Sequence, residues 1–328
     1  MIFLISLGLA AAFAAASRKA LKKRPYVFYA AAVLISAASG AFTFSGAPDW
    51  ARLYVVPVFQ RGAFATALFA VVMYAGALKN GSRLIKLLMP VRGELSIFAA
   101  ILVFGHNIAY GKTYFRYLFA SPERLDTQTL AAAVISLALL CLLIPLTVTS
   151  FPRVRKKMKA RTWKKLQRTA YAYYALVYVH VMLLTVPAAR AGRSGYALTV
   201  LAYSVVFLGY AAMRIRKALR KRPFAVMFSP YAGAAFALAA VCTVAFPAAS
   251  AAEPGIEPTP LAAVAADTGT RRYNDGTYTG SGEGYNGSVT VSVTIENDAV
   301  TELAVAGHSD DKAYFGDAWD AIYPAVLE

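Results

Sequence analysis

Long runs of apolar residues, separated by short polar connections, dominate the first 250 positions of the chain. About eight of these runs reach or approach the roughly 17–25 residues that a helix needs to cross a bilayer. They lie near residues 2–17, 26–46, 62–79, 95–115, 129–150, 169–188, 196–213 and 224–248. The pattern predicts a mainly α, polytopic transmembrane bundle of about eight helices, of which the first is the shortest.

The hydrophobic pattern changes after residue 248. Residues 249–273 are rich in Ala, Pro and Glu without periodicity, which is typical of a flexible linker. Residues 288–295 then alternate strictly between polar and β-branched apolar side chains, as a half-buried strand does. A turn at 296–298 and a second strand at 300–305 complete a predicted hairpin. Helical spacing over 311–323, up to Pro324, completes a small α+β C-terminal domain.

Charge divides the chain at the same place. Residues 1–250 carry 31 Lys and Arg against 4 Asp and Glu, whereas residues 251–328 carry 3 against 13. The mean hydropathy of +0.50 is too high for an ordinary soluble domain. The basic residues lie in short loops between apolar runs, where membrane topology and anionic lipid headgroups account for them. We therefore expect the lipid bilayer, and no nucleic acid, as a partner.

The basic loops alternate with loops of sparse or mixed charge. Four loops are strongly basic, at residues 18–24, 79–92, 153–168 and 214–222, and the loops near 47–61, 112–128 and 189–195 are not. The positive-inside rule places the four basic loops in the cytoplasm. The sequence thus predicts a multi-pass plasma membrane protein with an outside N-terminus and an extracytoplasmic C-terminal domain.

Two segments also resemble signal peptides. The first run ends in Ala14-Ala15-Ala16, a possible cleavage site, but its basic residues follow the apolar run, which favours an uncleaved helix. In the eighth run, cleavage near Ala248-Ala249-Ser250-Ala251 would free the tail. We expect both segments to stay attached.

Two of the three histidines, His106 and His180, lie inside apolar runs, where an ionisable side chain indicates function. Each lies twelve residues beyond the cytoplasmic start of its helix, at Glu94 and Arg168, so both rings share a depth of about 18 Å. Two facing imidazoles at one depth fit the axial ligands of a six-coordinate haem b. Hydrogen bonding to a neighbouring helix is the alternative. Small residues near His106, namely Ala99, Gly105 and Ala109, could make room for a macrocycle. The two cysteines, Cys141 and Cys242, are expected to be packing residues.

Around both histidines the sequence resembles the ferric reductase-like transmembrane family. The resemblance covers roughly residues 60–215. It rests on Leu84-Ile85-Lys86-Leu87, on Val91 through Phe98 with His106 and Tyr110, and on Thr162 through Tyr171 with His180. Members include eukaryotic ferric reductases and the haem-bearing membrane subunit of the bacterial methionine sulfoxide reductase system. The resemblance implies a haem b bundle with His106 and His180 as axial ligands of the iron.

One position departs from that family's W-x-x-L-H-R-x-x-Y pattern, because Gln167 stands where the pattern has histidine. A Gln amide is a poor haem ligand, so we expect a single haem at the outer site. A membrane quinol is then one route for electrons to enter. No G-x-G-x-x-G nucleotide-binding fold follows the bundle, so direct NADPH oxidation is not expected.

The tail resembles the start of the FMN-binding domain of flavin-bearing subunits in sodium- and proton-linked redox complexes. The resemblance covers about residues 273–328 and rests on the run Gly276 through Tyr285, the alternating strand, His308 and the following helix. It implies FMN contacts at Gly280, Gly282, Gly284, Tyr285 and His308. For His308 taken by itself, solvent exposure is the main expectation and a place beside the flavin is the alternative; for the glycines, the alternative is a lead-in to the hairpin without a ligand. The D-x-x-[S/T]-G-A-T attachment segment is absent, so the domain is expected to be incomplete and covalent FMN attachment is not supported.

These expectations combine into one architecture. It comprises N-terminal transmembrane helices (1–60), a haem-binding bundle (61–223), a last transmembrane helix (224–248), a linker (249–273) and an incomplete FMN-binding domain (274–328). The expected function is electron transfer from a cytoplasmic or quinol donor through haem b to the FMN domain and an external acceptor, which makes the chain a candidate oxidoreductase. One alternative is a non-enzymatic haem subunit that serves a partner reductase. Another is a transporter or sensor whose tail binds a ligand.

Overall fold

The computed structural model describes residues 2–41, 48, 50–78, 81–192, 195–219, 259–260, 273–283, 288–308, 310 and 312–327. The chain divides into two compact units, one formed by Met1–Ala120 and Thr127–Pro247 and the other by Ser121–Asp126 and Ala248–Glu328. The predicted eighth helix, 224–248, and most of the predicted linker lie outside the described residues.

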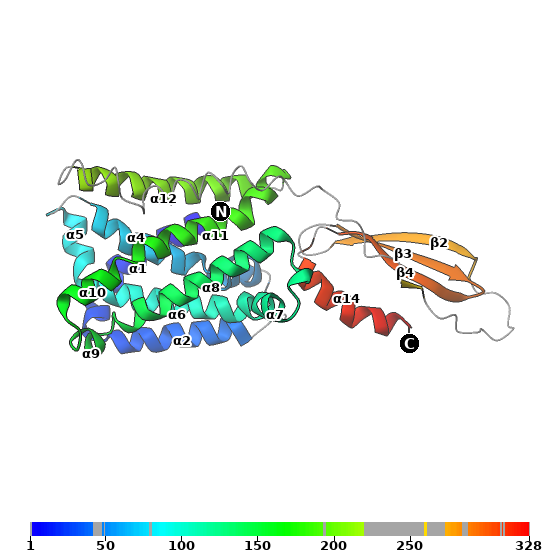
Figure 1. Cartoon of the computed structure of the whole chain (residues 1–328), viewed down its shortest axis with the longest axis horizontal. Coiled ribbons are helices and arrows are strands. Elements are labelled where there is room, and N and C mark those ends of the chain that lie inside the picture. Colours follow the sequence, from blue (N-terminus) through cyan, green and yellow to red (C-terminus); the bar gives the residue numbers. More distant parts are fainter. Residues whose placement is uncertain are drawn as a thin grey trace. The chain divides into compact units, whose positions relative to one another are not determined.

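The first unit is a bundle of helices (Figure 1). Its longer helices are α1 (Ile2–Lys23), α2 (Pro25–Ala41), α4 (Ala63–Ala77), α6 (Arg92–His106), α8 (Thr127–Val148), α11 (Ala170–Arg190) and α12 (Tyr196–Leu219). The shorter ones are η1 (Ala51–Val55), α3 (Val56–Gln60), α5 (Arg83–Leu88), η2 (Met89–Val91), η3 (Asn107–Gly111), α7 (Lys112–Ala120), α9 (Pro152–Arg155) and α10 (Ala160–Gln167). Each of the first seven predicted segments overlaps one of the longer helices.

Five helical stretches among the described residues are long and apolar enough to span a membrane. They are Ile2–Lys23, Arg83–Ala120, Thr127–Val148, Ala160–Arg190 and Tyr196–Leu219, whereas Pro25–Ser39 and Ala63–Ala77 are apolar but shorter. A mainly helical, multi-pass membrane protein is therefore confirmed, but the finer expectation of eight spanning helices is not.

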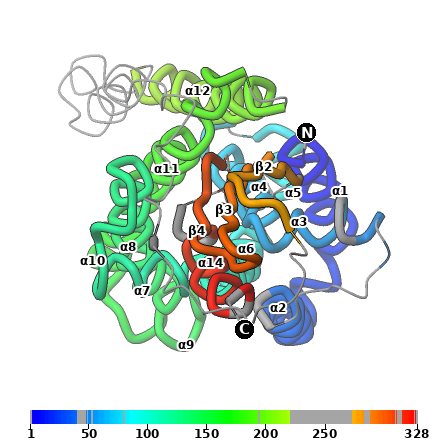
Figure 2. The backbone as a smooth tube through the Cα atoms, turned by 90° about the vertical axis from the view of Figure 1, so that its right-hand side faces the viewer, coloured from blue at the N-terminus to red at the C-terminus, as the bar shows by residue number. Residues whose placement is uncertain are grey.

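The bundle is built from two groups of helices. In one group α1 packs on α4, and α6 packs on α2 and α4; in the other, α11 packs on α8 and α12, and α12 also contacts α4. Figure 2 shows the bundle end-on, with α1 and α2 on one side and α8 and α10 on the other. The helices α6 and α11, which carry the two membrane histidines, are not main packing partners of each other.

Polar contacts at the basic end of the bundle tie the helices together. Lys22 of α1 forms an ion pair with Glu94 of α6 at 2.9 Å. Arg214 and Lys217 of α12 donate to the carbonyl oxygen of Gly76 at 3.2 and 3.0 Å, which places two cations at the C-terminal end of α4. Cations favour this end of a helix because its last carbonyl groups carry partial negative charge.

The second unit contains an antiparallel sheet in the strand order β1-β4-β3-β2, followed by one helix. Among the described residues its elements are η4 (Pro122–Arg124), β1 (Thr259–Pro260), β2 (Gly276–Glu283), β3 (Ser288–Glu296), β4 (Ala299–Gly307) and α14 (Lys312–Leu327). The predicted hairpin is confirmed: β3 pairs with β4, and the turn residues Asn297 and Asp298 have φ angles of 54° and 60°. Asn and Asp tolerate such left-handed angles better than most side chains do.

Two details of this unit differ from expectation. The glycine-rich run is itself a strand, β2, because it pairs along its whole length with β3. The helix was predicted to end before Pro324, yet α14 continues to Leu327 with Pro324 inside it. One proline removes a single intrahelical hydrogen bond, so the last turn of a helix can form around it.

Candidate functional site

The first membrane histidine is held by its own group of helices. His106 is the last residue of α6, and the chain continues directly into the π-helical turn η3. Its Nδ1 lies 2.7 Å from the carbonyl oxygen of Gln60 at the end of α3. A carbonyl only accepts hydrogen bonds, so Nδ1 carries the proton and Nε2 keeps a free lone pair. Single π-helical turns inside α-helices are frequent at functional sites.

Gly62 is shaped to receive this ring. It connects α3 to α4 with a φ of +68°, and a Cβ built there would lie 3.3 Å from Cγ of His106. The left-handed backbone and the narrow space both favour glycine. The tight turn therefore brings the Gln60 carbonyl to the ring and leaves room for the imidazole beside it.

The second membrane histidine is held by the other group. Nδ1 of His180, on α11, lies 3.2 Å from Oγ of Ser136 on α8. The Ser136 hydroxyl donates its one proton to the carbonyl oxygen of Ala132 at 2.9 Å, so it accepts from the imidazole. Nδ1 of His180 thus also carries the proton, and Nε2 is left with a lone pair.

The two imidazoles have matching surroundings. The α6 and α11 helices both run away from the basic end of the bundle, as the common depth requires (Figure 1). Both residues are partly buried. Among the described residues, no hydrogen bond occupies Nε2 of either ring.

The donor set limits which metal these residues could hold. Across the described part of the chain, no three His, Cys, Asp or Glu side chains come together as a metal site. A metal bound here would have to bring most of its own ligands. A porphyrin iron does so, because it needs only two imidazole nitrogens from the protein. Nε2 of His106 and Nε2 of His180 are the two nitrogens that such a group would use.

Two smaller expectations for the bundle have different outcomes. Gly105 was expected to make room for a macrocycle, but a Cβ there would lie 2.7 Å from Cα of Ser36 in α2. Its missing side chain therefore permits the close approach of α2 and α6. Gln167 donates instead to Oγ1 of Thr149 at 3.2 Å, near the C-terminal end of α8. That contact gives Gln167 a structural role, and its expected lack of haem binding stays a prediction.

In the sheet unit, the predicted flavin contacts lie at one end of the strands. Gly280 and Gly282 pair with Val291 and Val289 on β3, so they share the apolar face of the sheet. Both are exposed, and nothing lies within 4 Å of a Cβ built on either one. They leave the apolar face bare along the edge strand β2. Gly284 and Tyr285 lie outside the described residues.

His308 follows Gly307, which pairs with Thr290, and Thr290 pairs with Ser281 between the two glycines. It therefore lies at the same level of the sheet as these glycines but two strands away, about 10 Å at ordinary strand spacing. The His308 ring is partly buried, so full solvent exposure was wrong. It stacks on Phe315 with a centroid distance of 3.9 Å and an interplanar angle of 7°.

Sequence reasoning missed the groups that hold the two imidazoles. Gln60 contributes a main-chain atom, and Ser136 lies 44 positions from its histidine. The one available signal was Ser136, the single hydroxyl side chain between Thr129 and Thr147.

The helices and the separate sheet define a multi-pass membrane protein with a small additional α+β unit. The chain belongs to the same family as an uncharacterized protein of Treponema pallidum (strain Nichols). The two are 36% identical over 315 residues, which cover 95% of this chain and 87% of the relative. No family model and no solved structure matches the chain.

Proposed function

We propose that the chain is a membrane electron-transfer protein that holds one haem b between His106 and His180. The observation that carries the proposal is the shared state of the two imidazoles. Each donates its Nδ1–H to an oxygen of its own helix group and keeps Nε2 free. Haem-ligating histidines use this arrangement, because the Nδ1 hydrogen bond fixes the ring orientation and raises the basicity of Nε2.

The residues divide the work between the two helix groups. Gln60 and Gly62 orient the first ring, and Ser136 orients the second. A bound haem, held by His106 and His180, would supply one-electron chemistry, and ligation by both imidazoles would leave its iron closed to oxygen. The sequence resemblance to the ferric reductase-like family at both helices supports the same proposal.

The tail has a flavin-binding role in this proposal. The apolar face of the sheet at Gly280 and Gly282 suits a planar ring, because no side chain covers the backbone there and a ligand can approach it closely. Electrons would pass from a cytoplasmic or quinol donor through haem b to FMN outside the cell, and from there to an external acceptor. The positive-inside pattern of the loops supports this orientation.

A reduced-minus-oxidised absorption spectrum of the purified protein tests the haem. We expect a haem b α band in the unaltered protein and its loss in His106→Ala and His180→Ala. His308→Ala is the matched control, since it removes the third histidine from the other unit, and it should keep the band. Absence of the band from haem-replete membranes would refute the proposal and favour a transporter or sensor.

Two further assays separate the roles of the tail. Bound flavin, measured by fluorescence after extraction, should fall in Gly280→Val and Gly282→Val while the haem band persists. Reduction of ferric chelates by the protein alone would identify a reductase. Haem without that activity would identify a membrane subunit that serves a partner enzyme.

A further inference from the structure

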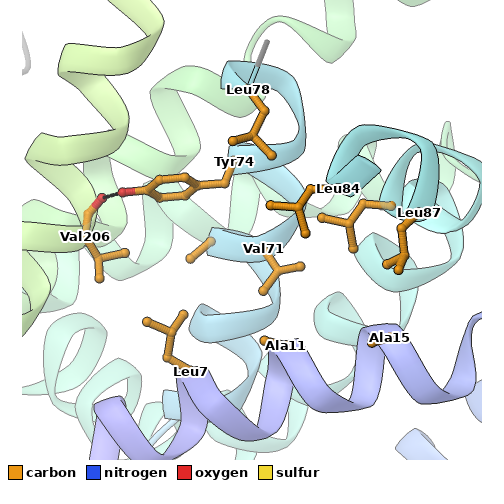
Figure 3. A pocket seen from close by; sticks show the side chains of 11 residues that line it. Leu7, Ala11, Ala15, Val71, Tyr74, Leu78, Leu84, Leu87 and Val206 are labelled. Carbon is orange, nitrogen blue, oxygen red and sulfur yellow. Dashed lines mark hydrogen bonds between the residues drawn. The ribbon is translucent and has the colours of Figure 1, made fainter. Parts of the chain in front are cut away.

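A second feature of the bundle lies apart from the two histidines. A groove of about 450 Å³ runs between α1, α4, α5 and α12 (Figure 3). Ala11 and Ala15 form its floor along α1, and Leu84 and Leu87 of α5 stand at the Ala15 end. Ala11, Ala15 and Leu84 are exposed, so the groove is open along the side of the bundle.

The groove offers nothing to a polar ligand head. Its lining is aliphatic except for Tyr74. The Tyr74 hydroxyl donates to the carbonyl oxygen of Val206 at 2.7 Å, so its one proton is already used (Figure 3). A quinone needs hydrogen-bond donors for its carbonyl oxygens. The lining therefore favours a plain hydrocarbon chain over a quinone.

Positive charge gathers at one end of the groove. Arg18 and Lys19 follow Ala15 by three and four residues, so they continue its face of α1. Arg83 and Lys86 lie on α5 beside the leucines of the lining. All four side chains are exposed, and within the described residues no ion pair or hydrogen bond involves them. The neighbouring Lys22, by contrast, is paired with Glu94.

We propose that this groove is a binding site for an anionic phospholipid. One acyl chain lies in the groove along α1, and the headgroup phosphate meets the four cations at the Ala15 end. Hydrocarbon alone would accept any lipid, so the cations set the preference for a negative headgroup. This end belongs to the basic loops that the positive-inside rule assigns to the cytoplasm, where anionic lipids attract Lys and Arg.

Native mass spectrometry of the full chain in detergent tests the site. The protein is titrated with phosphatidylglycerol and, separately, with phosphatidylcholine of the same acyl chains. We expect one phosphatidylglycerol to be retained in preference to phosphatidylcholine. Arg83→Gln with Lys86→Gln should weaken its binding about 25-fold, since each cation near an anionic headgroup contributes roughly five-fold. The control Lys156→Gln with Lys157→Gln, in another basic loop, should change nothing.

A second variant tests the groove itself. Ala15→Phe fills the floor and should block retention, whereas Ala16→Phe, outside the lining, should not. If Ala15→Phe fails to fold, the variant Arg83→Gln with Lys86→Gln still tests the site, because it changes only exposed side chains. Equal binding of both lipids would overturn the proposal. The proposal would also fail if a prenylquinone displaced the lipid and bound equally well to the Arg83→Gln, Lys86→Gln variant. It would fail as well if Ala11→Cys formed crosslinks to cysteines placed in residues 224–248, because the groove would then hold that segment of the chain. The haem spectrum should be unchanged in every variant, so this test is independent of the proposed function.

Discussion

Replacing Ser136 by alanine would remove the hydroxyl that accepts from Nδ1 of His180 while leaving the backbone of α8 intact. The hydrogen bond is long, at 3.2 Å, and joins two neutral groups. Such a bond contributes about 0.5–1.5 kcal/mol, and its length places it toward the lower part of that range. Because this bond makes Nε2 a stronger donor to iron, its loss should weaken haem retention two- to five-fold.

The same change should raise the midpoint potential of the haem. A more basic imidazole stabilises ferric iron, so a less basic one favours the ferrous state. If about 0.5–1 kcal/mol is lost from the ferric form alone, the one-electron potential rises by roughly 20–40 mV. A redox titration of the α band and the ratio of haem to protein measure the two effects.

Two further variants make this test specific. Ser96→Ala is the matched control, because the Ser96 hydroxyl also donates to a carbonyl four residues earlier, at 2.9 Å, but contacts no histidine. Ser136→Thr keeps the hydroxyl and should restore the original potential. If Ser136→Ala titrated like both of these proteins, the hydroxyl would have no part in holding an iron ligand, and the reasoning would fail.

Three further predictions concern packing and the absent family histidine. Gly62→Ala should lose haem and lower the free energy of unfolding by about 1–2 kcal/mol. Gly192→Ala is its control, because Gly192 has a similar φ of +73° but no atom within 4 Å of the added Cβ, so it should lose stability and keep haem. Equal haem content in the two variants would contradict the prediction. Gly105→Ala should lower the thermal unfolding temperature, because overpacking against α2 costs about 1–3 kcal/mol. Gly93→Ala on the same helix should leave it unchanged. Matching melting curves for the two variants would count against the close approach of α2 and α6. Gln167→Ala should keep the α band at full height, and loss of the band would refute a single haem at the outer site.

The sequence predicted a helix or strand well where the spacing of its apolar residues matched the face that is buried in the structure. The strand at 288–295 and its hairpin partner were found because alternation matches a sheet with one apolar face. The strand β2 was missed, because its glycines carry no such pattern and it forms through pairing with its neighbour. Helix bounds were predicted less well: the run 95–115 predicted one helix, whereas α6 continues after His106 into the π-helical turn η3 and then into α7, which ends at Ala120.

At the candidate site, residue types could be predicted but their partners could not. Two histidines in apolar runs stand out in any reading of the chain, because burying an ionisable group there is costly. The pairing of Ser136 with His180 depends on how α8 packs against α11, which periodicity does not encode. Gly105 was predicted by its type as space for a haem beside His106, but the structure uses its missing side chain for the packing of α6 on α2.

The atom that orients His106 is a main-chain oxygen, and every amino acid has one. Residue 60 could therefore differ among relatives without loss of this contact, and any constraint on the Gln60 side chain would come from its own hydrogen bond to the carbonyl oxygen of Ser39, at 2.8 Å. Selection would act instead on the path of the chain, through the left-handed glycine two positions later. In this family an invariant glycine at position 62 would mark the support of the imidazole more faithfully than a conserved polar side chain at position 60.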